Sequence, residues 1–199
     1  MDRAVVGLGN PGPEYAATRH NVGFRAVERL ARRLGAERWR GGRGARRAVA
    51  AVGDLEVVLA EPLGFMNRSG APVRALLREY GLEPADCLVI HDDLDLELGR
   101  LQIKRGGGTA GHRGLDSIVE ALGRSDFPRL RIGVGRPARG AEAVDYVLSP
   151  FEEAERAPLE AALARAEEAV LAWLEVGTEA AMGRVNVRRR ALEPPEPGC

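Results

Sequence analysis

The fold class of this chain is predicted best from Ala4-Val5-Val6-Gly7-Leu8-Gly9-Asn10-Pro11-Gly12-Pro13-Glu14-Tyr15. Its apolar start is typical of a buried strand, so the glycines that follow lie at the carboxyl end of that strand. Open α/β sheets bind their ligands at this edge. We therefore expect an α/β fold with a functional loop directly after its first strand.

The glycines at positions 7, 9 and 12 match the G-x-G-x-x-G fingerprint of dinucleotide-binding folds, but their surroundings argue against that function. In a true fingerprint the third glycine lies in a helix whose amino terminus meets a pyrophosphate. Here a proline stands on each side of Gly12 and disfavours a helix. The acidic residue expected about 20 positions later, at the end of a second strand, is also missing, because Glu28 lies within a helical pattern.

The same loop and its continuation carry three polar side chains to the edge of the predicted sheet. They are the amide of Asn10, the phenol of Tyr15 and the imidazole of His20. Histidine titrates near neutral pH and is the commonest general acid or base. The alternative is that His20 has a purely structural role. This stretch alone does not distinguish a catalytic histidine from a structural one.

Length and composition predict one domain. The 199 residues are 45% hydrophobic, which is enough for a single core. We assign 1–190 to this domain and expect the proline-rich end, 191–199, to be disordered. The charges balance at 29 against 29, yet arginines cluster at 38–47 and 188–190. The zero net charge does not exclude a polyanionic partner. For each cluster, however, we favour the interpretation that its arginines only face solvent.

Cysteine usage and hydropathy predict a soluble, cytoplasmic protein. Cys87 and Cys199 do not make a disulfide framework, which favours a reducing compartment. No apolar run approaches the ~20 residues of a membrane span. The amino terminus also lacks the apolar region of a signal peptide.

Interleaved strand and helix patterns predict a single-domain α/β fold. The expected helices are 21–34, 71–80, 115–122, 149 to about 176 and a short one from Thr178, and the expected strands are 48–52, 55–60, 86–91, 100–104 and 129–134. Ser69 is the expected cap of the second helix, and a capping box at 149–152 is expected to begin the long one. The segment 40–47 is expected to be a mobile loop. These elements predict a twisted, mixed but largely parallel sheet with helices on both faces.

Polar side chains follow the predicted strands in four segments, 10–20, 65–67, 91–95 and 104–113, which predicts that they converge on one cleft. The run His91-Asp92-Asp93-Leu94-Asp95 has three readings. It is a metal site, a solvated acidic turn, or the source of an aspartate that orients a histidine and stabilises its protonated form. These readings stay open on the residues alone.

The glycine-rich run 106–114 precedes a predicted helix and indicates anion capture by exposed backbone N–H groups. It is not a Walker A loop, because His112-Arg113 stands where Lys-Ser/Thr is required. Lys104, Arg105 and Arg113 flank the run and favour a phosphate. A turn without chemical consequence is the alternative.

Five motifs in order give a family resemblance from Val5 to about Leu174. They are Val-Gly-Leu-Gly-Asn-Pro-Gly-Pro-Glu-Tyr with Thr-Arg-His-Asn-Val-Gly, Pro-Leu-Gly-Phe-Met-Asn-Arg-Ser-Gly, His-Asp-Asp-Leu-Asp-Leu, Gly-Gly-Gly-Thr-Ala-Gly-His-Arg-Gly-Leu and Phe-Pro-Arg-Leu-Arg-Ile-Gly-Val-Gly-Arg-Pro. The chain resembles bacterial-type peptidyl-tRNA hydrolase. The resemblance implies a monomeric α/β enzyme, without metal or other cofactor, that cleaves the ester between a peptide and the 3′-terminal ribose of tRNA. Its partner would be peptidyl-tRNA released prematurely from ribosomes, bound at the acceptor end and 3′ CCA.

The resemblance also implies roles for individual residues. His20 is the general base for the attacking water, Asp92 holds it in its basic form, and Asn10 helps to distinguish blocked from free aminoacyl groups. The implied binding residues are Tyr15, Phe65 and Asn67 at the acceptor and peptide site, and Lys104 and Arg131 at a tRNA phosphate. An activated ester needs only a positioned water, a base and neutral hydrogen-bonding groups, which these residues offer.

Two residues depart from the family's common pattern. Gly64 stands where a threonine is common, and Arg113 stands where many members have an asparagine that contacts substrate. A guanidinium prefers phosphate, so we expect Arg113 to bind tRNA more than to take part in the chemistry. The alternatives are an RNA-binding protein without turnover, a metal-dependent hydrolase and a nucleotide-dependent oxidoreductase. A pure binder has no need of His20 together with Asp92.

Overall fold

The computed structural model describes residues 1–137 and 142–187. The predicted disordered tail at 191–199, the domain boundary at 190 and the arginines at 188–190 lie outside the described residues. Within the described ranges, no helix is both long enough and apolar enough to cross a membrane.

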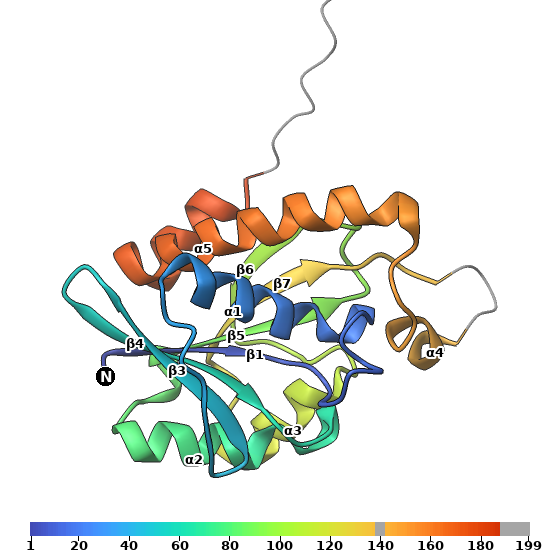
Figure 1. Ribbon diagram of the computed structural model, residues 1–199. Helices are drawn as coiled ribbons and strands as arrows, with labels where there is room; N and C mark the ends of the chain where they lie inside the picture. The colour runs from blue at the N-terminus through green and yellow to red at the C-terminus, as the bar shows by residue number, and fades with distance from the viewer. Residues whose placement is uncertain (138–141, 188–199) are drawn as a thin grey trace, which may run out of the picture.

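A seven-stranded mixed sheet forms the centre of the molecule, in the order β2-β3-β4-β1-β5-β7-β6 (Figure 1). The strands are β1 (Arg3–Gly7), β2 (Arg40–Gly42), β3 (Ala45–Val52), β4 (Leu55–Pro62), β5 (Cys87–Asp93), β6 (Leu101–Arg105) and β7 (Pro128–Gly133). β1 pairs in parallel with β4 and β5, and β5 pairs in parallel with β7. The strands β2, β3 and β6 run antiparallel to their neighbours. This confirms the predicted α/β fold with a mixed sheet.

Helices cover both faces of the sheet, as predicted (Figure 1). α1 (Val22–Arg33) and α5 (Glu153–Val185) lie over one face, α2 (Gly70–Tyr80) and α3 (Arg113–Leu122) lie over the other, and the short α4 (Ala143–Val147) lies at one end. Short 3-10 turns span Arg19–Asn21, Met66–Arg68 and Pro84–Asp86. Gly177, with φ of 76°, interrupts α5 where the sequence predicted a break between two helices.

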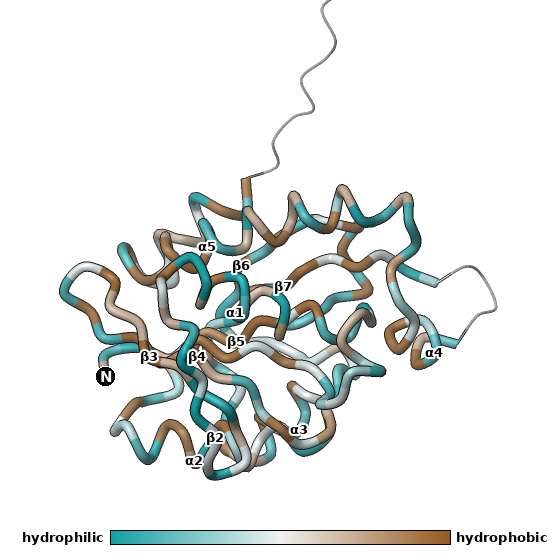
Figure 2. The backbone as a smooth tube through the Cα atoms, viewed as in Figure 1, coloured by the Kyte–Doolittle hydropathy of each residue, from teal (hydrophilic) through white to brown (hydrophobic). Residues whose placement is uncertain are grey.

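Alternate side chains of β1 enter two separate hydrophobic cores. Val5 packs with the core beneath α1 and α5, whereas Ala4 and Val6 pack with the core beneath α2 and α3. Figure 2 shows hydrophobic stretches, in brown, along the central strands. Because the central strands are buried on both faces, their carboxyl ends are where the sheet can present polar groups to solvent.

The long helix begins later than predicted. α5 starts at Glu153, and its capping box pairs Glu152 with Glu155. The box predicted three residues earlier does not form. Residues 149–150 are held instead in a tertiary contact, in which Pro150 forms a β-bridge with Thr18.

The predicted side-chain cap of α2 is also wrong. The Ser69 hydroxyl donates to the carbonyl of Met66, within the 3-10 turn that leads into the helix, and so does not cap it. A Cβ added at Gly70 would collide with the carbonyl oxygen of Ser117 in α3. The first residue of α2 is therefore a glycine because α2 and α3 cross here without room for a side chain.

The segment 40–47 is not the mobile loop that its composition suggested. It forms β2 and the first part of β3, and Arg46 pairs with Glu61 on β4 and Glu28 on α1. Arg47 pairs with Glu79 of α2 at 2.6 Å. These two guanidinium groups pair with carboxylates of neighbouring elements, which favours a structural use of Arg46 and Arg47.

Candidate active site

A cleft of about 680 Å³ opens at the carboxyl ends of the parallel strands. The segments after β1, β4 and β5, the loop before α3, and α4 form its walls. Its lining includes Asn10, Tyr15, His20, Phe65, Asn67, Asp92 and Arg113. The predicted convergence of four polar segments on one cleft is confirmed.

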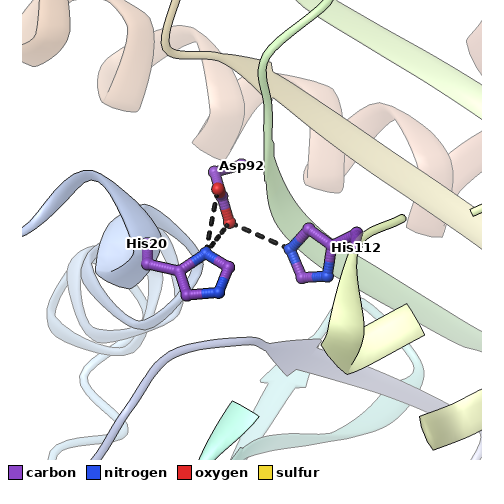
Figure 3. A group of neighbouring side chains, drawn as sticks. All are labelled: His20, Asp92 and His112. Atoms are coloured by element: carbon purple, nitrogen blue, oxygen red, sulfur yellow. Dashed lines mark hydrogen bonds and ion pairs between the residues drawn. The ribbon is translucent and has the colours of Figure 1, made fainter. Parts of the chain in front are cut away.

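His20 and Asp92 form a hydrogen-bonded pair in this cleft (Figure 3). They are 72 positions apart in the chain, and Nδ1 of His20 lies 2.9 Å from each carboxylate oxygen of Asp92. An ionised carboxylate can only accept hydrogen bonds, so Nδ1 carries a proton and Nε2 keeps its lone pair. Of the three readings of the acidic run, this geometry favours an aspartate that orients a histidine.

His112 is a second donor to the same carboxylate (Figure 3). Its Nε2 lies 3.0 Å from Oδ1 of Asp92. Its Nδ1 accepts from the backbone N–H groups of Gly114 and Leu115, so His112 is the N-cap of α3. A neutral imidazole has one N–H, and with Nδ1 accepting, that proton is on Nε2. The start of α3 therefore fixes the tautomer of His112 that donates to Asp92.

The pKa of Asp92 reflects these two donors. Burial by itself would raise the pKa of this carboxyl, but its interactions with His112 and His20 outweigh burial and hold it below its usual range. Asp92 is thus ionised, and it can stabilise positive charge on the imidazole of His20.

The cluster of His20, Asp92 and His112 also brings three atoms that could bind a metal within 4.8 Å of one another. A metal would need the lone pair of Nε2 of His112, which carries a proton in this hydrogen-bonding arrangement. If that proton moved to Nδ1, Nδ1 could no longer accept hydrogen bonds from the two backbone N–H groups, and α3 would lose its cap. As arranged, the cluster does not fit a metal ion.

His91 is buried beside the cluster. Its Nδ1 lies 2.7 Å from the backbone carbonyl of Asp92 and donates to it, and its ring meets that of His112 nearly at a right angle. Burial lowers the pKa of His91 to about 3. His91 is therefore neutral, and it adds no positive charge that would compete with His20 for Asp92.

Asn10 is held by backbone and side-chain partners. Its N–H donates to Oδ1 of Asn21 and its carbonyl accepts from Nδ2 of the same side chain, each at 2.9 Å. The Oδ1 of Asn10 accepts from the N–H of Met66 at 2.8 Å. This leaves Nδ2 of Asn10 as the group that can donate to a ligand. Asn67 lines the same cleft from the turn that Met66 begins.

Apolar side chains form another part of the cleft wall. The rings of Tyr15 and Phe65 meet edge to face with centroids 6.3 Å apart, and Phe65 is 54% exposed. Val144 of α4 and the following Leu148 add exposed aliphatic groups. The sequence pattern does not predict α4, because five residues are too few to show a helical periodicity.

Arg113 is the first residue of α3, and its exposed side chain lines the cleft. The glycine-rich run before it does not offer all the backbone donors that the sequence predicted. His112 already takes the N–H groups of Gly114 and Leu115. An anion here would be bound by the guanidinium of Arg113 more than by the end of the helix.

Lys104 and Arg131 lie outside the cleft lining, on the neighbouring strands β6 and β7. The residues that alternate with them, Ile103 and Leu130, belong to the core beneath α5. Both basic side chains therefore lie on the α3 side of the sheet. Arg131 donates to Asp93 at 2.6 Å, and since Asp93 lines the cleft, Arg131 adjoins it.

His112 has no predicted role, although it donates to the same carboxylate as His20 does. Its neighbours in the chain gave no indication of a partner 20 positions away. One signal was present: the chain has three histidines, and His20, His91 and His112 all lie in the recognised motifs.

The chain matches one protein family over most of its length. The family model described as Peptidyl-tRNA hydrolase matches residues 4–193. A peptidyl-tRNA hydrolase of Symbiobacterium thermophilum is 48% identical over 188 residues, covering 94% of this chain and 100% of that protein. Another, from Aquifex aeolicus, is 43% identical over 184 residues, covering 92% of this chain and 96% of that protein.

The fold also matches a solved structure. The crystal structure of peptidyl-tRNA hydrolase from Acinetobacter baumannii has a TM-score of 0.87 and 35% sequence identity to this chain. The match covers 93% of this chain and 94% of that one. The similarity therefore extends over the sheet, the helices and the segments that form the cleft.

Proposed function

This chain belongs to the peptidyl-tRNA hydrolase family, and from that premise we propose how its residues carry out the reaction. The enzyme hydrolyses the ester bond of peptidyl-tRNA. The observation that carries the proposal is the pair of His20 and Asp92. The contacts of 2.9 Å at Nδ1 leave the lone pair of Nε2 for a proton.

His20 acts as the general base. Its Nε2 takes a proton from water while the water oxygen attacks the ester carbonyl carbon. Asp92 stabilises the imidazolium that results, and His112 holds Asp92 in place. When the tetrahedral intermediate collapses, the bond from the carbonyl carbon to the ribose oxygen breaks, and His20 gives its proton to that oxygen. The products are the peptide acid and a tRNA with a free hydroxyl on its 3′-terminal ribose.

Two amides hold the ester and its peptide. Nδ2 of Asn10 donates to a carbonyl oxygen of the substrate, and Asn67 binds the same part of it. A blocked aminoacyl group has an additional carbonyl where a free one has an ammonium group. Asn10 can bind the carbonyl but not the ammonium, because an Nδ2 donor has no acceptor to offer.

The tRNA binds by its acceptor end. The rings of Tyr15 and Phe65 stack on bases of the 3′ CCA, as exposed aromatic rings do for single-stranded nucleic acids. Arg113 binds a phosphate at the cleft, and Lys104 with Arg131 binds another beside it. The enzyme acts as a monomer in the cytoplasm, since one chain supplies the whole cluster and peptidyl-tRNA arises during translation there.

The test compares N-acetyl-aminoacyl-tRNA with unblocked aminoacyl-tRNA as substrates of the purified protein. We expect hydrolysis of the blocked substrate alone. Equal cleavage of both would contradict the role of Asn10, and cleavage of neither would leave a tRNA-binding protein. Activity should persist in EDTA. A loss that zinc or magnesium restores would assign Asp92 to a metal.

A further inference from the structure

Arg19, directly before His20 in the chain, carries a buried guanidinium group that the proposed reaction does not use. Its side chain is 3% exposed. It lies between two aromatic rings, with its central carbon 4.2 Å from the ring centroid of Tyr146 and 5.1 Å from that of Phe151. A charge this deeply buried is strongly destabilising unless it is paired and hydrogen-bonded.

The partners of Arg19 lie where α4 leads into α5. One terminal nitrogen donates to the carboxylate of Glu155 at 2.5 Å, and the other donates to Oγ of Ser149 at 2.7 Å and to the carbonyl of Pro150. The backbone makes the same connection, because the N–H of Arg19 donates to the carbonyl of Ser149 at 3.1 Å and Thr18 bridges to Pro150. Arg19 therefore binds this junction through its side chain and its backbone.

The junction continues α4, which forms part of the cleft wall. Ser149 Oγ donates to the carbonyl of Tyr146 at 2.8 Å, and the Tyr146 hydroxyl donates to the carbonyl of Val134, just after β7, at 2.8 Å. Ser149 and Tyr146 are not among the cleft-lining residues, but Val147 and Leu148, which lie between them in the chain, are. Figure 1 shows α4 beside the blue segment that contains Arg19.

The 3-10 turn Arg19–Asn21 thus sends three side chains in three directions. Arg19 reaches the junction of α4 with α5, His20 reaches Asp92, and Asn21 reaches the backbone of Asn10. We propose that Arg19 is a positioning residue, which holds His20 against Asp92 and fixes the distance between the base and the α4 wall of the cleft. This inference rests on the proposed role of His20 as the base.

A displaced base lowers the rate without removing the binding groups. Misplacement of a reacting group by about 1 Å can lower a rate by about 10²-fold. Arg19→Gln removes the charge and the forked donor, so we expect kcat to fall by about 10²-fold with KM little changed. Arg19→Lys, which keeps the charge for Glu155, should recover part of kcat. Ser149→Ala should lower kcat in the same direction by a smaller factor.

Arg25→Gln is the matched control. Arg25 also lies near the ring of Phe151, at 6.0 Å, and pairs with Glu160 of α5 at 2.9 Å. It belongs to α1 and is not among the cleft-lining residues. Its kcat and KM should match those of the unchanged protein, so an equal fall in kcat for Arg25→Gln would overturn the inference.

The experiment measures kcat, KM and the midpoint of thermal unfolding for each variant, with N-acetyl-aminoacyl-tRNA as substrate. Variants of Arg19 and Ser149 that lower only the unfolding midpoint would overturn the inference. If Arg19→Gln does not fold, Arg19→Lys and Ser149→Ala are judged by the same criterion.

A double variant tests whether Arg19 acts through the pair of His20 and Asp92. Combining Arg19→Gln, or Arg19→Lys in its place, with Asp92→Asn should lower kcat by less than the product of the two single-variant factors. A fall in kcat equal to that product would also overturn the inference. Full activity of His20→Ala would instead contradict the proposed function itself.

Discussion

Asp92 and Glu61 are both buried carboxylates of the sheet, yet their surroundings affect them in opposite ways. Burial raises the pKa of any carboxyl group. His20 and His112 surround Asp92 and hold its pKa below the usual range. Glu61 pairs with Arg46 through one oxygen, and within the described ranges its Oε1 has no hydrogen-bond partner. Burial, opposed in part by Arg46, raises the pKa of Glu61 to about 7.

The hydrogen-bond donors around a buried carboxylate, more than its burial, therefore determine its chemical role. Glu61 faces Arg46 across β3 and β4 and helps to attach these strands to α1 through Glu28. Asp92 stands at the end of β5 in the cleft, where its charge can respond to a proton arriving on His20. Four predictions compare these two regions.

The largest expected effect comes from removing the base beside Asp92. His20→Ala should lower kcat by about 10²–10⁴-fold, the usual contribution of a positioned general base. The midpoint of thermal unfolding should stay nearly unchanged, because Asp92 keeps the donor from His112. Hydrolysis of N-acetyl-aminoacyl-tRNA and circular dichroism measure the two quantities. A variant that does not fold would indicate that His20 has a structural role instead.

The same change from carboxylate to amide should separate the two regions. Asp92→Asn removes the charge that stabilises the imidazolium, so kcat should fall by about 10²-fold. It should be non-additive with His20→Ala, since the two residues act as one unit. Glu61→Gln should leave kcat and KM unchanged, because Glu61 is not among the cleft-lining residues. An equal loss of activity in both variants would contradict the prediction that Asp92 acts in catalysis and Glu61 does not.

Glu61 should instead affect stability, in a way that depends on pH. Its pKa is near 4.5 in an unfolded chain and about 7 in the fold, so between these values the folded protein binds the extra proton. The stability that this group contributes is present below its unfolded pKa and is lost as the pH rises through about 7. From about pH 5 to about pH 8, the free energy of unfolding should fall by about 1–3 kcal/mol more in the native protein than in Glu61→Gln. Urea unfolding at both pH values measures this, and equal falls would show that Arg46 fully offsets the burial of Glu61.

The smallest effect is expected at the second donor to Asp92. His112→Ala removes the N-cap of α3, which should lower the free energy of unfolding by about 0.5–2 kcal/mol. It should lower kcat less than His20→Ala does, because the base remains. His112→Asn keeps a cap acceptor, so it should recover most of the stability in urea unfolding. A fall in kcat as large as that of His20→Ala would give His112 a direct part in the chemistry.

Elements with strong local patterns were predicted well, and the errors lie where distant residues intervene. The strand before the first glycine-rich loop, β1, is confirmed because an apolar run and the glycines that end it are local signals. The start of α5 was placed too early because Ser149 has a good capping pattern but bonds to Arg19, 130 positions away. The segment 40–47 looked mobile because its composition does not show that Glu61 will face Arg46.

Local sequence patterns are enough to predict most strands and helices along the chain, except β2 and α4, together with the polar loops at the strand ends and the family motifs that contain His20 and Asp92. These follow from periodicity and turn chemistry, which act over a few residues. Only the tertiary structure decided that Nδ1 of His20 meets Asp92, that the start of α3 fixes the proton of His112, and that Arg19 anchors the turn to the end of α4. The physical reason is that hydrogen bonds need atoms placed to within tenths of an ångström. Segments far apart in the chain reach that accuracy only when β1 and β5 pair in the sheet and α3 and α5 pack against it.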